Sequence, residues 1–170
     1  MVVTQRRIFV SYHHGSDRAY YDEFARIFSG TYEILHDRSV DRPIGSEDPE
    51  CVIRRIRENY LTGSSVTVVL CGSNTWGRKY VDWEILASLN QGMGLIGVNL
   101  PTNLQESDGS SLVPDRFYDN WRSGYALWQQ WQEVVSDPLS FRQNIEIALK
   151  SSKSLIGNSR AKRLRNEPLR

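Results

Sequence analysis

The segment that most constrains the fold of this chain is residues 64–71, with the sequence SSVTVVLC. It is continuously apolar at its centre and rich in β-branched residues. Such a run is typical of a central strand in a parallel sheet, where helices cover both faces of the strand. The chain is therefore expected to fold as an α/β protein around this strand.

Further strand-like segments alternate with segments of helical periodicity on both sides of this run. The strands are expected over residues 7–12, 31–36 and 95–100, with a fifth near 126–131. Helices are expected after an N-cap at Asp17, from Pro49, over residues 78–90, and after the Asp137–Pro138 pair. This alternation implies right-handed crossovers. The expected fold is a flavodoxin-like three-layer sandwich with a doubly wound parallel sheet of four to five strands.

Length and charge limit the classes of function. We expect one domain over residues 1–150 and a polar, basic, disordered tail over residues 151–170. The formal net charge of +1 gives no basis for predicting a nucleic-acid binder. No apolar run has the roughly 18 residues of a membrane span, and the first residues lead directly into a strand. We therefore predict a cytoplasmic protein with no membrane partner and two reduced cysteines, Cys51 and Cys71.

Several common catalytic motifs are absent from the sequence. There is no phosphate-cradling P-loop and no nucleophile elbow. The three histidines lack metal-ligand spacing, so no metal site is expected. Residues 92–97 (GMGLIG) match the dinucleotide pattern GxGxxG, but they follow a helix and open a strand. A dinucleotide loop must follow a strand and open a helix, so we do not interpret this match as a nucleotide site.

The chemistry is expected where the first and third strands end, because ligands of doubly wound sheets bind beyond the carboxyl ends of the strands, where the strand order reverses. Tyr80 and Glu84 are four residues apart and share one face of the helix after the third strand. Acidic residues early in a helix also stabilise its dipole, so the pattern alone leaves a purely structural role open. The candidate binding residues around Glu84 are Ser11, Tyr12, His13, Asp37, Ser73, Asn74 and Tyr80.

At these residues the sequence resembles the TIR-like domains, especially the bacterial branch found in the Thoeris antiphage system. The resemblance rests on residues 6–14 (RRIFVSYHH), 35–48 (LHDRSVDRPIGSED), 64–85 (SSVTVVLCGSNTWGRKYVDWEI) and 94–101 (GLIGVNLP). It implies a TIR-like domain that uses NAD⁺ as a substrate, with no permanently bound cofactor. It also implies that Glu84 is the catalytic residue. Tyr80 and Val81 stand where this family usually has Trp and Cys.

The chemistry that the resemblance implies is physically reasonable. Nicotinamide leaves NAD⁺ as a neutral molecule, and positive charge develops on the ribose, where one carboxylate can stabilise it. Attack by water produces ADP-ribose, whereas attack by an internal nucleophile produces a cyclic product. Tyr12 is expected to stack on a base, and Asp37 with its following loop is expected to close over the site.

The resemblance further implies an effector protein that senses the nucleotide product, and it leaves a homo-oligomer open. Two other functions also remain open at this point. One is a non-catalytic module for protein–protein interaction, which would tolerate the substitution Glu84→Gln. The other is an enzyme like the nucleoside deoxyribosyltransferases, which would exchange bases on deoxynucleosides and leave NAD⁺ intact.

Overall fold

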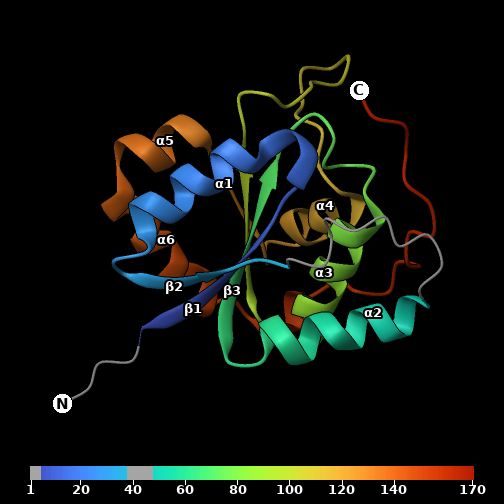
Figure 1. Cartoon of the computed structure of the whole chain (residues 1–170), viewed down its shortest axis with the longest axis horizontal. Coiled ribbons are helices and arrows are strands. Elements are labelled where there is room, and N and C mark those ends of the chain that lie inside the picture. The colour runs from blue at the N-terminus through green and yellow to red at the C-terminus, as the bar shows by residue number, and fades with distance from the viewer. Residues whose placement is uncertain (1–4, 38–47) are drawn as a thin grey trace.

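The computed structural model describes residues 5–37 and 48–170 and places a five-stranded sheet between two layers of helices (Figure 1). The sheet has the order β2-β1-β3-β4-β5, and every neighbouring pair is parallel. The expected three-layer, doubly wound sandwich is therefore confirmed. Its strands are β1 (Arg6–Ser11), β2 (Tyr32–Leu35), β3 (Ser64–Cys71), β4 (Gly94–Asn99) and β5 (Leu127–Gln130).

Helices cover both faces of the sheet (Figure 1). One layer consists of α1 (His14–Phe28), α5 (Trp131–Ser136) and α6 (Pro138–Leu149). The other consists of α2 (Pro49–Ile56) with its π-helical continuation η2 (Arg57–Leu61), α3 (Lys79–Asn90) and α4 (Asp115–Arg122). A short 3₁₀ turn, η3 (Lys153–Leu155), follows α6. Within the described residues, no helix combines the length and the hydropathy that crossing a membrane requires.

The core explains why β3 has no polar face. Val66, Val68 and Leu70 pack in the cluster under α1 and α6, whereas Val69 and Cys71 pack under α3 and α4. All five side chains are fully buried. Because successive side chains of a strand point to opposite faces, a strand between two helical layers is apolar on both faces, and its fully buried Thr67 is satisfied by a hydrogen bond to Ser88.

The start of α1 differs from the sequence expectation. Asp17 is not an N-cap: α1 begins at His14, and Asp17 lies inside it at a kink with φ −122° and ψ 17°. The backbone N–H of Asp17 already bonds the carbonyl of His13, at 2.9 Å, and its buried carboxyl accepts a hydrogen bond from Thr102. Its side chain therefore joins α1 to the segment after β4. The cap expected at Asp137 is confirmed, because its carboxylate accepts the N–H of Ser140.

The glycines of the GMGLIG segment serve turns and packing. Gly92 has φ +67°, a conformation that favours glycine, at the end of α3. A Cβ on Gly94 would lie 3.1 Å from the backbone of Ala148 in α6. A Cβ on Gly97 would lie 2.4 Å from the ring of Phe117 in α4. These close approaches explain the glycines of β4 without a nucleotide.

The structure also differs from the expectation for residues 151–170. Apart from η3, this segment is largely irregular, yet it lies against α3 and α4 (Figure 1). Asn158, for example, donates hydrogen bonds to the carbonyl of Leu86 and the side chain of Asn90. Composition predicted disorder because the segment has few apolar residues. Hydrogen bonds and ion pairs, which composition does not reveal, hold it instead.

Candidate active site

The candidate site centres on Glu84, in the second turn of α3, opposite the end of β1. Glu84 is only 3% exposed, and Ser11, the last residue of β1, donates a hydrogen bond to its carboxylate. Ser11 itself is 1% exposed. β1 and β3 are neighbours in the sheet, as the reversal of strand order required. Two residues that the sequence analysis selected independently, 73 positions apart, therefore touch.

Burial dominates the electrostatics of Glu84. It raises the pKa of this carboxyl well above its ordinary value of 4.5, and the negative charge of Asp37 raises it further. The hydrogen bond from Ser11 acts in the opposite direction, because it stabilises the ionised form. Asp37 is itself fully buried just after β2. Two buried carboxyl groups thus lie within electrostatic reach of each other at this edge of the sheet.

Interactions on the other side of α3 fix its position. The carboxylate of Asp82, in the first turn, pairs with the fully buried guanidinium of Arg116 from α4, through hydrogen bonds of 2.8 and 3.2 Å. One turn beyond Glu84, the hydroxyl of Ser88 donates to the Glu84 carbonyl and bonds the hydroxyl of Thr67 in β3. These contacts hold α3 against both α4 and the sheet, and so hold the Glu84 carboxylate at the end of β1.

Tyr12 lies inside a stack of rings rather than at an open surface. Its hydroxyl bonds Nδ1 of His36 at 2.9 Å. His14 and Tyr21 lie nearly parallel to its ring, with centroids at 4.2 and 4.8 Å. His36 is also within 5.3 Å of both His14 and Tyr21. These distances arrange the rings in three layers, with the Tyr12–His36 pair between the other two, and Tyr12 is only 2% exposed.

His13 and Asn74 belong to a second connected group. Nδ1 of His13 bonds the hydroxyl of Ser16 at 2.8 Å, and the amide of Asn74 donates to the same hydroxyl at 2.9 Å. The pKa of His13 is lowered, first by burial and then by the positive charge of Arg78. The loops after β1 and β3 are thus joined, as the sequence analysis expected, through a serine that it did not select.

The remaining candidates are less closely tied to Glu84. Tyr80 contacts Trp83 edge-on, with centroids 5.2 Å apart, beside the core cluster under α2 and α3. Ser73 is half-buried in the turn after β3. The loop that follows Asp37 falls largely on residues 38–47, which lie outside the described residues. Among the described residues, no group of three His, Cys, Asp or Glu side chains is arranged to hold a metal ion.

Several residues beside the site were not expected from the sequence. His14, Tyr21 and His36 complete the ring stack, and Ser16 and Arg78 adjoin His13. His36 directly precedes Asp37 at the end of β2, and this position was the only sequence signal for it. Nothing in the periodicity distinguished Ser16 or Arg78 from ordinary surface residues.

Known proteins resemble this chain in sequence and in fold. A Bacillus cereus (strain MSX-D12) protein named "Putative cyclic ADP-D-ribose synthase ThsB1" is 35% identical over 51 residues, which are 30% of this chain and 27% of that protein. The match thus spans about a quarter of that relative. The TIR domains of the activated Roq1 resistosome, which directly recognizes the pathogen effector XopQ, align over 89% of this chain and 84% of theirs, with a TM-score of 0.40 and 10% identity.

The third similarity covers more than half of the chain. The profile of the family described as "Thoeris protein ThsB, TIR-like domain" matches residues 9–105, a range that runs from β1 to beyond β4 and contains Ser11, Asp37 and Glu84. The fold and the order of the strands agree with the resemblance noted in the sequence. The chain therefore belongs to the ThsB TIR-like domain family of Thoeris proteins.

Proposed function

We propose that this protein cleaves the nicotinamide–ribose bond of NAD⁺ and releases an ADP-ribose-type product, linear or cyclic, as a signal in antiphage defence. The observation that carries the proposal is the buried Glu84 carboxylate, held by Ser11 at the carboxyl edge of the sheet. The name of the B. cereus relative, a cyclic ADP-D-ribose synthase, supports the same chemistry.

Electrostatics accounts for how one carboxylate could serve this reaction. The nicotinamide ring of NAD⁺ carries a positive charge, and as the glycosidic bond breaks this charge moves onto the ribose. A carboxylate in a water-poor site interacts strongly with such a charge, because little solvent screens it. Burial and the negative charge of Asp37 raise the pKa of Glu84, so this carboxyl by itself resists ionisation. A bound cation would reverse this effect, so substrate binding and ionisation of Glu84 favour each other.

Electrons and charge are both conserved when the nicotinamide–ribose bond breaks. The electrons of the C–N bond leave with nicotinamide, which departs neutral, and the ribose becomes an oxocarbenium-like cation that Glu84 stabilises. Water then adds to the ribose carbon and loses a proton, or a nucleophile of the same molecule closes a ring. NAD⁺ is a substrate in this scheme and not a bound cofactor. The partner that the scheme implies is an effector that senses the product.

The beginning of α3 has a cationic side chain of the kind that a dinucleotide needs. Arg78 directly precedes α3 and acts electrostatically on His13. A cationic side chain at the beginning of a helix suits a phosphate group, because the free N–H groups of the first turn point in the same direction. We assign the pyrophosphate to Arg78 and the nicotinamide ribose to Glu84 and Ser11, with Asn74 and Ser73 between them.

The test is an assay of purified protein with NAD⁺, in which nicotinamide release is followed and the products are separated by mass. Glu84→Gln should lower the rate at least about 100-fold, as losses of one electrostatic stabiliser do. The matched control is Glu106→Gln, since Glu106 is an exposed glutamate distant from α3 in the sequence. Equal turnover by both variants would contradict the role of Glu84. Base exchange on deoxynucleosides without NAD⁺ cleavage would instead support the deoxyribosyltransferase-like reading.

A further inference from the structure

The last residues of the chain form a strap, residues 157–170, that runs antiparallel to α3 and ends at the candidate site (Figure 1). Its successive contacts move backward along the sequence, from the end of α3 to the turn after β3. Strap residues Asn158, Arg163, Asn166, Glu167 and Arg170 hydrogen-bond Leu86, Asp82, Lys79, Gly77 and Asn74, respectively. The strap therefore follows α3 along its length, on the side that carries Asp82, and reaches the candidate site at Asn74.

The first half of the strap, residues 157–163, is anchored to buried groups. The fully buried side chain of Asn120 makes two hydrogen bonds to the backbone of Gly157, at 2.8 and 2.9 Å. The backbone N–H of Arg163 donates to Asp82, and its carbonyl accepts from the indole of Trp83. Removing this half would leave these buried polar groups without partners, which is costly.

The second half, residues 164–170, hydrogen-bonds the buried side chain of Asn74 but has no buried apolar side chain of its own. Leu164 and Leu169 are 68% and 64% exposed. Hydrogen bonds to the N–H of Lys79, the carbonyl of Gly77 and the side chain of Asn74 hold this half. Segments with few apolar contacts and exposed hydrogen bonds open locally at low cost. The two halves thus differ in how readily they can leave the domain.

The second half nevertheless occupies groups that belong to the site. The backbone N–H of Arg170 donates to the side-chain oxygen of Asn74 at 2.6 Å, and the amide of Asn74 donates back to the Arg170 carbonyl at 3.3 Å. Asn74 also bonds Ser16, the hydroxyl that contacts His13. The guanidinium of Arg170 lies 5.5 Å from the centre of the Trp76 ring. A docked strap therefore occupies both ends of the Asn74 amide, the side chain that connects the two site loops.

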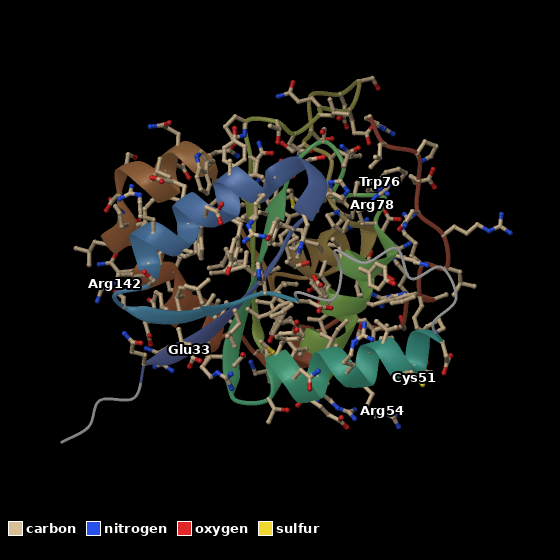
Figure 2. The ribbon with its side chains drawn as sticks, viewed as in Figure 1. Glu33, Cys51, Arg54, Trp76, Arg78 and Arg142 are labelled. Carbon is tan, nitrogen blue, oxygen red and sulfur yellow. The ribbon has the colours of Figure 1, made fainter. Side chains whose placement is uncertain are left out.

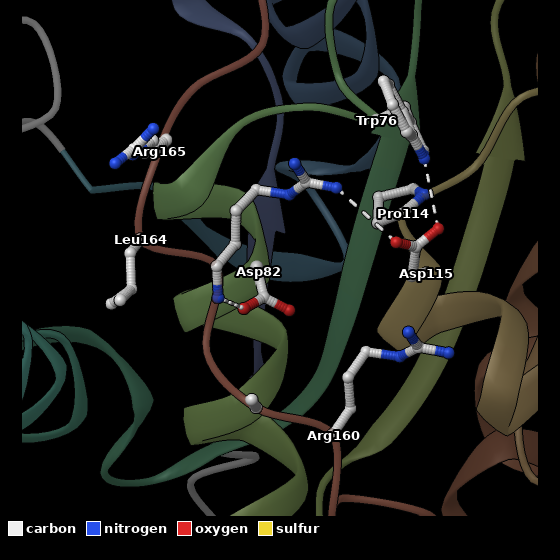
Figure 3. Close-up of a pocket in the computed structure, with 9 residues that line it drawn as sticks. Trp76, Asp82, Pro114, Asp115, Arg160, Leu164 and Arg165 are labelled. Carbon is white, nitrogen blue, oxygen red and sulfur yellow. Dashed lines mark hydrogen bonds and ion pairs between the residues drawn. The ribbon is translucent and has the colours of Figure 1, made fainter.

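Docking of the strap also has a cost. The guanidinium of Arg163 lies 5.0 Å from the centre of the Trp76 ring, and its positive charge repels that of Arg78. The pKa of Arg78 is lowered, first by burial and then by Arg163. In addition, the strap bridges a cavity of about 570 Å³ instead of filling it (Figure 3). Trp76, Asp82 and Asp115 line this cavity from the domain, and Arg160 and Leu164 line it from the strap.

We propose that residues 164–170 are a releasable cover of the active site, and that the protein takes up its dinucleotide only when this segment leaves Asn74 and Gly77. The inference rests on the proposed function. In the docked state the turn after β3 is closed over by the strap, while the anchored half keeps the released segment tethered close to its site. A cover that is docked nine-tenths of the time would weaken apparent substrate binding about tenfold.

Two independent changes can release the cover. One is deletion of residues 164–170. The other is Gly77→Ala in the full chain, because a Cβ at this position would lie 2.4 Å from Cβ of Glu167 and the strap must move away. Gly77 has no positive φ, so alanine is compatible with the backbone there. The matched control is Gly30→Ala, where a Cβ would meet nothing within 4 Å.

The first readout follows docking and does not depend on activity. The backbone N–H of Lys79 donates to the side chain of Asn166, so hydrogen exchange at Lys79 reports whether the strap is docked. Deletion and Gly77→Ala should each speed this exchange at least about tenfold, whereas Gly30→Ala should not. Equally fast exchange in the unmodified chain would overturn the proposal, since the strap would then not be docked in solution.

The second readout is kcat/KM for nicotinamide release from NAD⁺. Each releasing change should raise it about tenfold, mainly through KM, and the two changes together should do no more than either alone, because both remove the same contact. Equal kcat/KM in all forms, with faster exchange at Lys79, would overturn the cover and leave the proposed function intact. If no form releases nicotinamide, the proposed cleavage is refuted, and the cover is then tested by measuring NAD⁺ binding. Binding about tenfold tighter after deletion of residues 164–170 would support the cover. Unchanged or absent binding would overturn it.

Discussion

Ser11 donates a hydrogen bond to the carboxylate of Glu84 and so joins the end of β1 to the second turn of α3. Both residues are almost completely buried. The bond fixes the direction of the carboxylate and opposes part of the rise in its pKa that burial and Asp37 cause. The two residues therefore form one unit, in which the serine adjusts both the position and the acidity of the glutamate.

The first prediction concerns stability and pH in Glu84→Gln. The pKa of Glu84 is raised on folding, so above about pH 4.5, where the unfolded chain releases this proton, the folded chain retains it. The free energy of unfolding then falls as pH rises through the folded pKa. Glu84→Gln removes this loss, so the variant should be the more stable protein at pH 8 and show a smaller advantage at pH 5. Urea unfolding at both values measures this; identical pH dependence in the two proteins would contradict it.

The second prediction is a shifted pH profile in Ser11→Ala. The hydroxyl of Ser11 stabilises the ionised form of Glu84, so its loss should raise the pKa of that carboxyl further. The rising limb of kcat/KM against pH should therefore move to higher pH, with activity partly regained there. Ser88→Ala is the control, because Ser88 is equally buried but bonds the Glu84 carbonyl and not its carboxylate. A pH-independent loss in Ser11→Ala would assign Ser11 to packing alone.

The third prediction separates the two roles that Tyr12 could have. Tyr12→Phe keeps the stacked ring but removes the hydroxyl that bonds His36. It should lower the free energy of unfolding by about 1 kcal/mol and leave KM for NAD⁺ within about twofold, because the ring is enclosed between His14 and Tyr21. Urea unfolding and the nicotinamide assay measure the two effects. A large rise in KM at unchanged stability would show that Tyr12 contacts the substrate directly.

The fourth prediction tests how α3 is held. Arg116→Ala leaves the carboxylate of Asp82 buried without its guanidinium partner and should cost about 3 to 5 kcal/mol of unfolding free energy. The double variant Arg116→Met/Asp82→Leu removes both charges and should be less destabilised than Arg116→Ala. Urea unfolding of the two variants makes the comparison. The exposed pair Arg6–Glu146 is the control: Arg6→Ala should change stability by less than about 1 kcal/mol.

The reactivity of the two cysteines is a simple check of how exposed each of them is in the folded protein. Cys51 is exposed on α2 (Figure 2), whereas Cys71 is fully buried at the end of β3 and its thiol pKa is raised by burial. A thiol reagent should therefore modify one cysteine in the folded protein and two after unfolding.

Figure 2 also shows Trp76 and Arg78 at the end of the molecule where the strap finishes.

Much of the fold could be read from local pattern. The boundaries of β3 were predicted to the residue, and Asp137 caps α6 as its sequence position indicated. Asp17 carried the same cap signal and was interpreted wrongly. Its carboxyl is used by Thr102, which is 85 residues away, and a hydrogen bond at that separation leaves no local trace. Residues 117–131 had no pattern that could be assigned, and part of this segment forms α4, in which Phe117 packs against Gly97.

The sequence by itself determined the α/β class, the neighbouring positions of β1 and β3, and the location of Glu84 beside Ser11. These follow from side-chain periodicity and from the handedness of crossovers, which depend on residues close together in the chain. Only the tertiary structure decided that Tyr12 is enclosed by rings, that Arg116 pairs with Asp82, and that the strap reaches Asn74 across 96 residues. Such contacts depend on burial and on segments that are distant in the sequence but adjacent in the fold. From composition alone, the polar and basic residues 151–170 are therefore expected to be disordered, although they bind their own domain.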